Sequence, residues 1–125
     1  GILTTDPRFE AFHDPWLRRR LQEGTPWAEV TTEIVSRLPQ QVYVSFDIDG
    51  LDPVLCPNTG TPVPGGLSFS EATALFRAVV ESGRQIVGFD LVEVAPDPSG
   101  ISEWDGNVAA RLLYKLIGFA LRSQR

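Results

Sequence analysis

Residues 42–53 read Val-Tyr-Val-Ser-Phe-Asp-Ile-Asp-Gly-Leu-Asp-Pro, and this stretch decides the fold. Its first five residues form a short apolar run rich in β-branched and aromatic side chains, which predicts a strand buried on both faces. Two aspartates, Asp47 and Asp49, follow directly. Functional groups of parallel α/β sheets lie just past the carboxyl ends of strands, so this position favours a functional site.

The sequence around this strand alternates helices with strands. Upstream, Asp14-Pro15 and Thr25-Pro26 each predict a helix start, with Asp14 as an N-cap. Downstream, residues 50–67 are rich in glycine and proline and predict a long ordered loop. Ser68 to Glu71 form a capping box that opens the next helix. A second strand is predicted at Gln85–Val94 and a last helix at about Asn107–Leu121.

This order predicts an α/β fold, with a partial parallel sheet covered by helices on both faces. The length of 125 residues suits one domain. The net charge of -5 offers no basic surface, so nucleic acid and membrane surfaces are poor partners. A single cysteine, Cys56, excludes an internal disulfide and fits a reducing compartment. We expect a cytoplasmic protein.

The two aspartates after the first strand are candidate metal ligands. In extended backbone, residues two apart point to the same side, so the carboxylates of Asp47 and Asp49 would converge. Such a pair is stabilised by protonation of one member or by a divalent cation between them. The alternative is that one aspartate caps a turn and the other is solvated.

The second strand carries two further acids. Asp90 interrupts an apolar run, so it must be hydrogen-bonded, neutralised by a cation, or located at the strand's end. Glu93 follows at the carboxyl end, at the same edge of the sheet as Asp47 and Asp49. It is either part of the site or an ordinary surface carboxylate.

Three motifs together resemble a known family. They are Ser-Phe-Asp-Ile-Asp-Gly-Leu-Asp-Pro at 45–53, Pro-Asn-Thr-Gly-Thr-Pro at 57–62, and Gly-Gly-Leu at 65–67. In this order they look like the C-terminal signature of the ureohydrolases, the family of arginase, agmatinase and formimidoylglutamase. Gly-Phe-Asp-Leu-Val-Glu-Val at 88–94 is similar to the family's next strand. The tail at 104–114 looks closer to agmatinase-like members.

The resemblance implies a manganese-dependent hydrolase of guanidinium or formimino C–N bonds, which releases urea or formamide. Asp47 and Asp49 would ligate a pair of Mn²⁺ ions, one bridging the metals and the other binding a single ion. Glu93 would receive a small-molecule guanidinium substrate, and Thr61 would lie near that group. Asp52 and Asp90 would orient the ligands or the motif backbone. The implied fold is the C-terminal part of a three-layer α/β/α domain, and we expect a homo-oligomer.

Two family motifs with the remaining metal ligands, Gly-Gly-Asp-His and Asp-Ala-His-x-Asp, do not occur in the sequence, nor does the family's proton-shuttle histidine. The single histidine, His13, is expected to be a surface or capping residue. Because the sequence begins with Gly1 and lacks these motifs, we expect residues 1–125 to form a C-terminal fragment of the ureohydrolase domain, inactive alone, with no catalytic residue assigned.

Three other interpretations share parts of this pattern. A non-catalytic remnant or domain excerpt would carry the same motifs without activity. A haloacid-dehalogenase-type phosphatase with Mg²⁺ also has strand-Asp-x-Asp-Gly, but it needs Thr or Val at Leu51 and a later lysine, and the only lysine is Lys115 in the last helix. An EF-hand calcium loop needs glycine at its sixth position, not its fourth.

Overall fold

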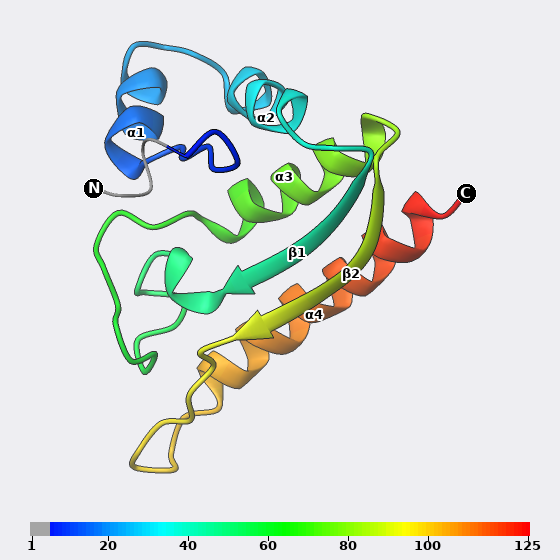
Figure 1. Ribbon diagram of the computed structural model, residues 1–125. Helices are drawn as coiled ribbons and strands as arrows, with labels where there is room; N and C mark the ends of the chain where they lie inside the picture. Colours follow the sequence, from blue (N-terminus) through cyan, green and yellow to red (C-terminus); the bar gives the residue numbers. More distant parts are fainter. Residues whose placement is uncertain (1–5) are drawn as a thin grey trace.

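The computed structural model describes residues 6–125. Within this range the chain forms four α-helices, two strands and one 3-10 turn in the predicted order (Figure 1). The elements are α1 (Asp14–Gln22), α2 (Trp27–Ser36), β1 (Gln41–Asp47), η2 (Ile48–Gly50), α3 (Phe69–Glu81), β2 (Gln85–Val92) and α4 (Trp104–Ser123). The α/β class and the long loop before α3 are confirmed.

The two strands lie side by side and run parallel, joined by the crossover through α3. Their register pairs Asp47, the last residue of β1, with Val92, the last residue of β2. The residues that follow each strand therefore begin at the same edge of the sheet. Asp49 and Glu93 come from segments far apart in the sequence but start from neighbouring positions.

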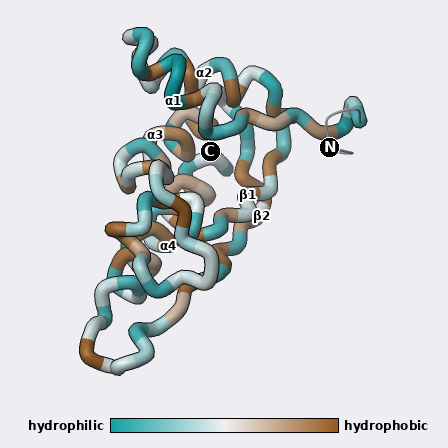
Figure 2. The backbone as a smooth tube through the Cα atoms, turned by 90° about the vertical axis from the view of Figure 1, so that its left-hand side faces the viewer, coloured by the Kyte–Doolittle hydropathy of each residue, from teal (hydrophilic) through white to brown (hydrophobic). Residues whose placement is uncertain are grey.

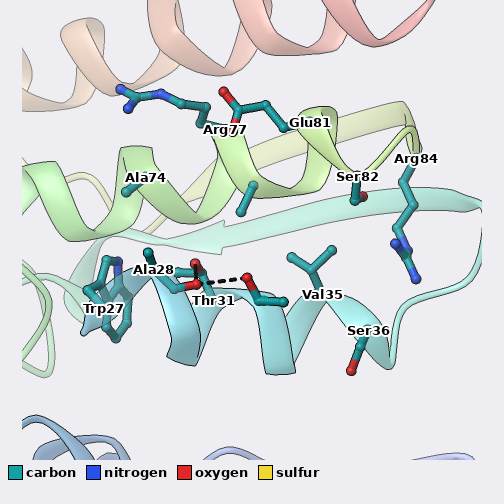
Figure 3. Close-up of a pocket in the computed structure, with 12 residues that line it drawn as sticks. Trp27, Ala28, Thr31, Val35, Ser36, Ala74, Arg77, Glu81, Ser82 and Arg84 are labelled. Carbon is teal, nitrogen blue, oxygen red and sulfur yellow. Dashed lines mark hydrogen bonds between the residues drawn. The ribbon is translucent and has the colours of Figure 1, made fainter. Parts of the chain in front are cut away.

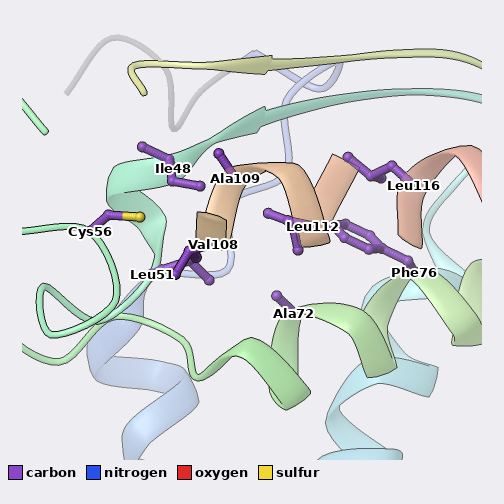
Figure 4. Packing of buried hydrophobic residues seen from close by; sticks show 9 residues of the cluster. All are labelled: Ile48, Leu51, Cys56, Ala72, Phe76, Val108, Ala109, Leu112 and Leu116. Atoms are coloured by element: carbon purple, nitrogen blue, oxygen red, sulfur yellow. The ribbon is translucent and has the colours of Figure 1, made fainter. Parts of the chain in front are cut away.

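One face of this sheet carries the core. Ile48 and Leu51 pack with Phe76 of α3 and with Leu112 and Leu116 of α4, all at most 3% exposed. In Figure 4 both helices lie on the same side of the two strands. The α3 segment begins where the sequence predicts, because Ser68 and Glu71 form the complete capping box.

The other face of the sheet is open. Tyr43 and Val87 are 59% and 56% exposed, and β1 alternates exposed with less exposed residues along its length. The prediction that β1 is buried on both faces is therefore wrong for the part of the chain that the structure describes. Alternating exposure of this kind marks a strand with one covered face.

Helix and strand ends differ from the predicted ends by a few residues. Helix α1 begins at Asp14, so the N-cap position belongs to His13 and not to Asp14. His13 is exposed, and its backbone carbonyl accepts hydrogen bonds from the N–H groups of Trp16 and Leu17. The prediction of a surface or capping histidine is confirmed. Helix α4 begins three residues before Asn107, and β2 ends at Val92.

Hydropathy alternates along the described elements and does not gather in one long apolar segment (Figure 2). Between residues 6 and 125, no helix is both long and apolar enough to cross a membrane.

Candidate metal and guanidinium site

The end of β1 turns sharply and does not continue as extended backbone. Asp47 is the N-cap of the 3-10 turn η2, and its Oδ1 accepts a hydrogen bond from the Asp49 N–H at 3.1 Å. The expected same-side arrangement along an extended strand is therefore wrong, because Asp49 already lies in the turn. The two aspartates still lie next to each other, because the hydrogen bond within the turn joins the Asp47 carboxylate to the Asp49 backbone. Asp47 has the turn-capping role of the alternative interpretation.

Asp49 is also hydrogen-bonded. The Thr61 hydroxyl donates to Asp49 Oδ2 at 2.5 Å, so this half-buried carboxylate is held by the loop that follows the motif. Among residues 6–125, Asp47 Oδ2 and Asp49 Oδ1 accept no hydrogen bond. Each aspartate thus keeps one oxygen for another ligand.

The same loop reaches the end of β2. Thr59 is only 5% exposed, and its hydroxyl donates to the Glu93 backbone carbonyl at 3.0 Å. Between the two threonines, a Cβ placed on Gly60 would lie 3.8 Å from Glu93 Oε2. A longer side chain at this position would therefore compete with the Glu93 carboxylate for space. Thr59 thus binds the residue after β2, and Thr61 binds the turn after β1.

Glu93 has an unusual backbone conformation. Its φ is +64°, and it is the one non-glycine residue with positive φ in the described range. This left-handed region is uncommon for residues with a Cβ and costs about 1 kcal/mol or more, so such residues cluster at functional sites. Glu93 directly follows β2 and is exposed. The conformation distinguishes it from an ordinary surface carboxylate.

Charge at this edge of the sheet is uncompensated. No ion pair within residues 6–125 includes Asp47, Asp49 or Glu93. Carboxylate oxygens are the ligands that hard divalent cations prefer. The donor set fits such a cation in kind, but it is incomplete in number. No group of three or more His, Cys, Asp or Glu side chains in the described range is arranged to hold a metal.

Asp52 and Asp90 are fixed by neighbours other than the site carboxylates. Asp52 Oδ1 accepts from the Val54 N–H at 3.0 Å, which tightens the turn after the motif. Asp90 accepts from the Ser45 hydroxyl at 2.8 Å and the Tyr43 hydroxyl at 3.1 Å on the open face of the sheet. The hydrogen bond to Asp90 raises the pKa of Tyr43. Asp90 is thus stabilised by hydrogen bonding, the first of the expected alternatives.

A buried carboxylate that the sequence did not reveal anchors the loop. Asp105, 4% exposed, accepts from the Asn58 backbone N–H at 2.9 Å and from Asn58 Nδ2 at 3.1 Å. It lies in the first turn of α4, where negative charge is favourable. The signal was an acid at a helix start, but a predicted start at Asn107 placed Asp105 outside the helix. Thr59 was missed because its partner is a backbone group.

The larger clefts lie elsewhere. A cleft of about 750 Å³ separates α2 from α3 and is lined by Trp27, Val35 and Arg77 among others (Figure 3). Further grooves follow the outer side of α4, around Tyr114 and Lys115. None of these clefts is lined by Asp47, Asp49 or Glu93.

Comparison with known proteins identifies the relatives of this arrangement. A model of the Arginase family matches residues 16–118. An N(1)-aminopropylagmatine ureohydrolase of Thermus thermophilus is 41% identical over 97 residues, which cover 78% of this chain and 30% of that enzyme. The solved proclavaminate amidino hydrolase of Streptomyces clavuligerus is 37% identical with a TM-score of 0.66, covering 78% of this chain and 32% of that one.

The solved agmatine ureohydrolase of Thermoplasma volcanium is 27% identical with a TM-score of 0.69, and the match covers 97% of this chain and 39% of that one. This chain therefore spans about a third of the length of the relatives it matches. The family model covers most of the chain, and the ordered motifs at 45–53 and 57–67 lie within it. The chain belongs to the arginase family, which includes these ureohydrolases and the amidino hydrolase.

Proposed function

We propose that this chain supplies the carboxyl-terminal part of the active site of a manganese-dependent, agmatinase-like ureohydrolase. The reaction adds water to a guanidinium carbon and breaks its bond to an amine, which leaves urea and the free amine. A formimino substrate would release formamide in the same way. The observation that carries the proposal is the loop at 59–61, which holds Asp49 and Glu93 together at one edge of the sheet.

Asp47 and Asp49 are the proposed metal ligands. Each retains a carboxylate oxygen that accepts no hydrogen bond in the described part of the chain, and neither is paired with a cation. Thr61 donates to the other oxygen of Asp49 and so limits the rotation of that carboxylate. A pair of bound divalent metals lowers the pKa of coordinated water and provides a nucleophile at neutral pH.

Glu93 is the proposed receptor for the guanidinium. A carboxylate can accept two parallel hydrogen bonds from this planar cation, which gives direction as well as attraction. The exposed position of Glu93 and the absence of a side chain at Gly60 leave its carboxylate accessible. The left-handed backbone conformation of Glu93 and the hydrogen bond from Thr59 to its carbonyl hold its main chain in place.

The site on this chain is incomplete, and we propose that residues 1–125 form one part of a larger catalytic domain. A catalytic centre with two metals needs several protein ligands for each metal. Two aspartates meet only part of that need, and within the described range no group of three or more His, Cys, Asp or Glu side chains could hold a metal ion. By itself the chain fits the non-catalytic alternative.

The test measures urea release from agmatine, N1-aminopropylagmatine and arginine, with manganese present, in a longer protein that contains this chain. We expect turnover that a chelator abolishes and added Mn²⁺ restores. The 125-residue chain should bind Mn²⁺ weakly and release no urea. Chelator-sensitive turnover by the short chain would refute the incomplete site. A longer protein without urea release or bound manganese would refute the function itself.

A further inference from the structure

We propose that Arg18 of α1 is a positioning residue for the site. Its guanidinium binds the turn at Gly65 and Gly66. The ordered turn then stabilises the backbone of residues 47–52. The effect expected on metal binding rests on the proposed function, whereas the effect on the backbone does not. Arg18 belongs to none of the motifs at 45–67.

Arg18 contacts the turn through several charge-assisted hydrogen bonds. Nη2 donates to the Gly65 carbonyl at 2.5 Å and to the Gly66 carbonyl at 2.7 Å, and Nε donates to the Gly65 carbonyl at 3.1 Å. Within residues 6–125, no other donor reaches these two carbonyls. Asp14 Oδ1 accepts from Arg18 Nε at 3.1 Å and orients the guanidinium. Hydrogen bonds from a charged donor are roughly twice as strong as neutral ones.

The turn is joined directly to the aspartate motif. A Cβ on Gly66 would lie 2.3 Å from the Leu51 backbone, so two stretches of main chain are in close contact here. The Leu67 N–H donates to the Gly50 carbonyl, and the Asp52 N–H donates to the Leu67 carbonyl, both at 2.9 Å. A displacement of Gly65 and Gly66 would therefore reach the segment that carries Asp47 and Asp49.

Helix α1 is attached to α2 by Arg20, which pairs with Glu33 at 2.6 Å and with Glu29 at 3.5 Å. None of its residues is buried, and all its side chains are partly or fully exposed. A role limited to securing α1 could be met by pairing with acids of a neighbouring helix, as Arg20 does with Glu29 and Glu33. Arg18 instead donates to two carbonyls of the turn. The contact therefore orders the glycine turn as much as it orders the helix.

The experiment compares Arg18→Ala with Arg19→Ala. Both changes remove one positive charge and one i,i+4 ion pair from α1. Only Arg18→Ala also removes the donors to the turn and the longer ion pair with Glu71 at 3.9 Å. In the longer protein, amide hydrogen exchange at Asp52 and Leu67 should accelerate roughly tenfold or more in Arg18→Ala, because charged hydrogen bonds are lost. Arg19→Ala should leave these amides unchanged. Arg18→Lys keeps the charge without the paired donors and should be intermediate.

The second readout is the apparent Mn²⁺ affinity, measured where every variant is folded. Loss of an outer contact to a metal site typically weakens affinity about 10–100-fold, and we expect the lower end for Arg18→Ala. Unchanged exchange at Asp52 and Leu67 would overturn the inference. Equal acceleration at core amides of α3 would overturn it too, since Arg18 would then act only on global stability. Faster exchange with unchanged Mn²⁺ affinity would refute its role at the site.

If the wild-type protein binds no Mn²⁺, the proposed function fails, yet the exchange comparison still decides whether Arg18 holds the motif backbone.

Discussion

The two strand ends hold their carboxylates in different ways. At the end of β1, the exposed Thr61 donates to the side chain of Asp49. At the end of β2, the buried Thr59 donates to the backbone of Glu93 and leaves its side chain free. At the end of β1 the carboxylate itself is held, whereas at the end of β2 only the main chain of the acidic residue is held. A metal ligand benefits from the first arrangement, and a group that must adjust to a substrate benefits from the second.

Both ends depend on one anchor. Asp105 binds the backbone and side chain of Asn58, the residue before Thr59, and so ties the loop to the first turn of α4. The variants below separate the two ends from each other and from this shared anchor.

The largest effect is expected when the β1 end loses a carboxylate. In the longer protein, Asp47→Ala or Asp49→Ala should remove a metal ligand and lower turnover by roughly four orders of magnitude, as for loss of a central catalytic group. Metal content and urea release measure the outcome. Glu81→Ala, which removes an exposed acid at the end of α3, should leave both unchanged. Normal manganese content and rate in the Asp47 and Asp49 variants would show that β1 does not carry the metal.

The β2 end should behave differently. Glu93→Gln keeps the shape of the side chain but removes the charge that we propose receives the guanidinium, so both metals should remain while kcat/KM falls. Loss of a charge-paired contact of this kind costs about 2–5 kcal/mol. Parallel measurement of metal content and kinetics separates the two ends. Loss of manganese in this variant would make Glu93 part of the metal site, and unchanged kcat/KM would remove it from the site.

The sequence predicted the order of the elements and the edge at which the carboxylates meet. Those features follow from local signals, such as the capping box at Ser68 and the apolar run at 42–46. The left-handed Glu93 and the contacts of Thr59 and Asp105 were not predictable in the same way. Each depends on hydrogen bonds between residues 34 or 47 positions apart, which no local pattern specifies.

The extended geometry of Asp47 and Asp49 was predicted wrongly for a related reason. The prediction extends the strand beyond Asp47. In the structure the Asp47 carboxylate caps the 3-10 turn, and the strand ends there. The burial of β1 on both faces was predicted from composition, which cannot show whether a second layer is present. Tyr43 and Ser45 instead bind Asp90 on the open face.

The two threonines offer a finer comparison. Thr59→Val should destabilise the protein by about 0.5–1.5 kcal/mol, because it removes the hydrogen bond that the buried Thr59 hydroxyl donates to the Glu93 carbonyl. Thr61→Val removes an exposed hydroxyl and should change stability little while weakening Mn²⁺ binding. Urea denaturation and metal titration of both variants give the result. Thr59→Ser, which keeps the hydroxyl, should recover most of the lost stability. Equal behaviour of Thr59→Val and Thr61→Val would contradict the distinction between the ends.

The smallest effect concerns the shared anchor. Cys56 lies two residues before Asn58 and is 2% exposed, and burial together with the nearby Asp105 charge raises its pKa to about 11 from 9.0. The folded state therefore holds this proton more tightly than the unfolded state. The stabilisation is complete below pH 9 and is lost as the pH rises towards 11, by about 1 kcal/mol at pH 10.

Urea denaturation of the wild type and of Cys56→Ala at pH 7.5 and pH 10 isolates this contribution, because other groups that titrate in this range are common to both proteins. The wild type should lose about 1 kcal/mol more than the variant between the two pH values. Equal losses would mean that the thiol has an ordinary pKa. Water would then reach the Cys56 side chain in solution, so the start of the loop that leads to Asn58, Thr59 and Thr61 would pack less tightly than the structure shows.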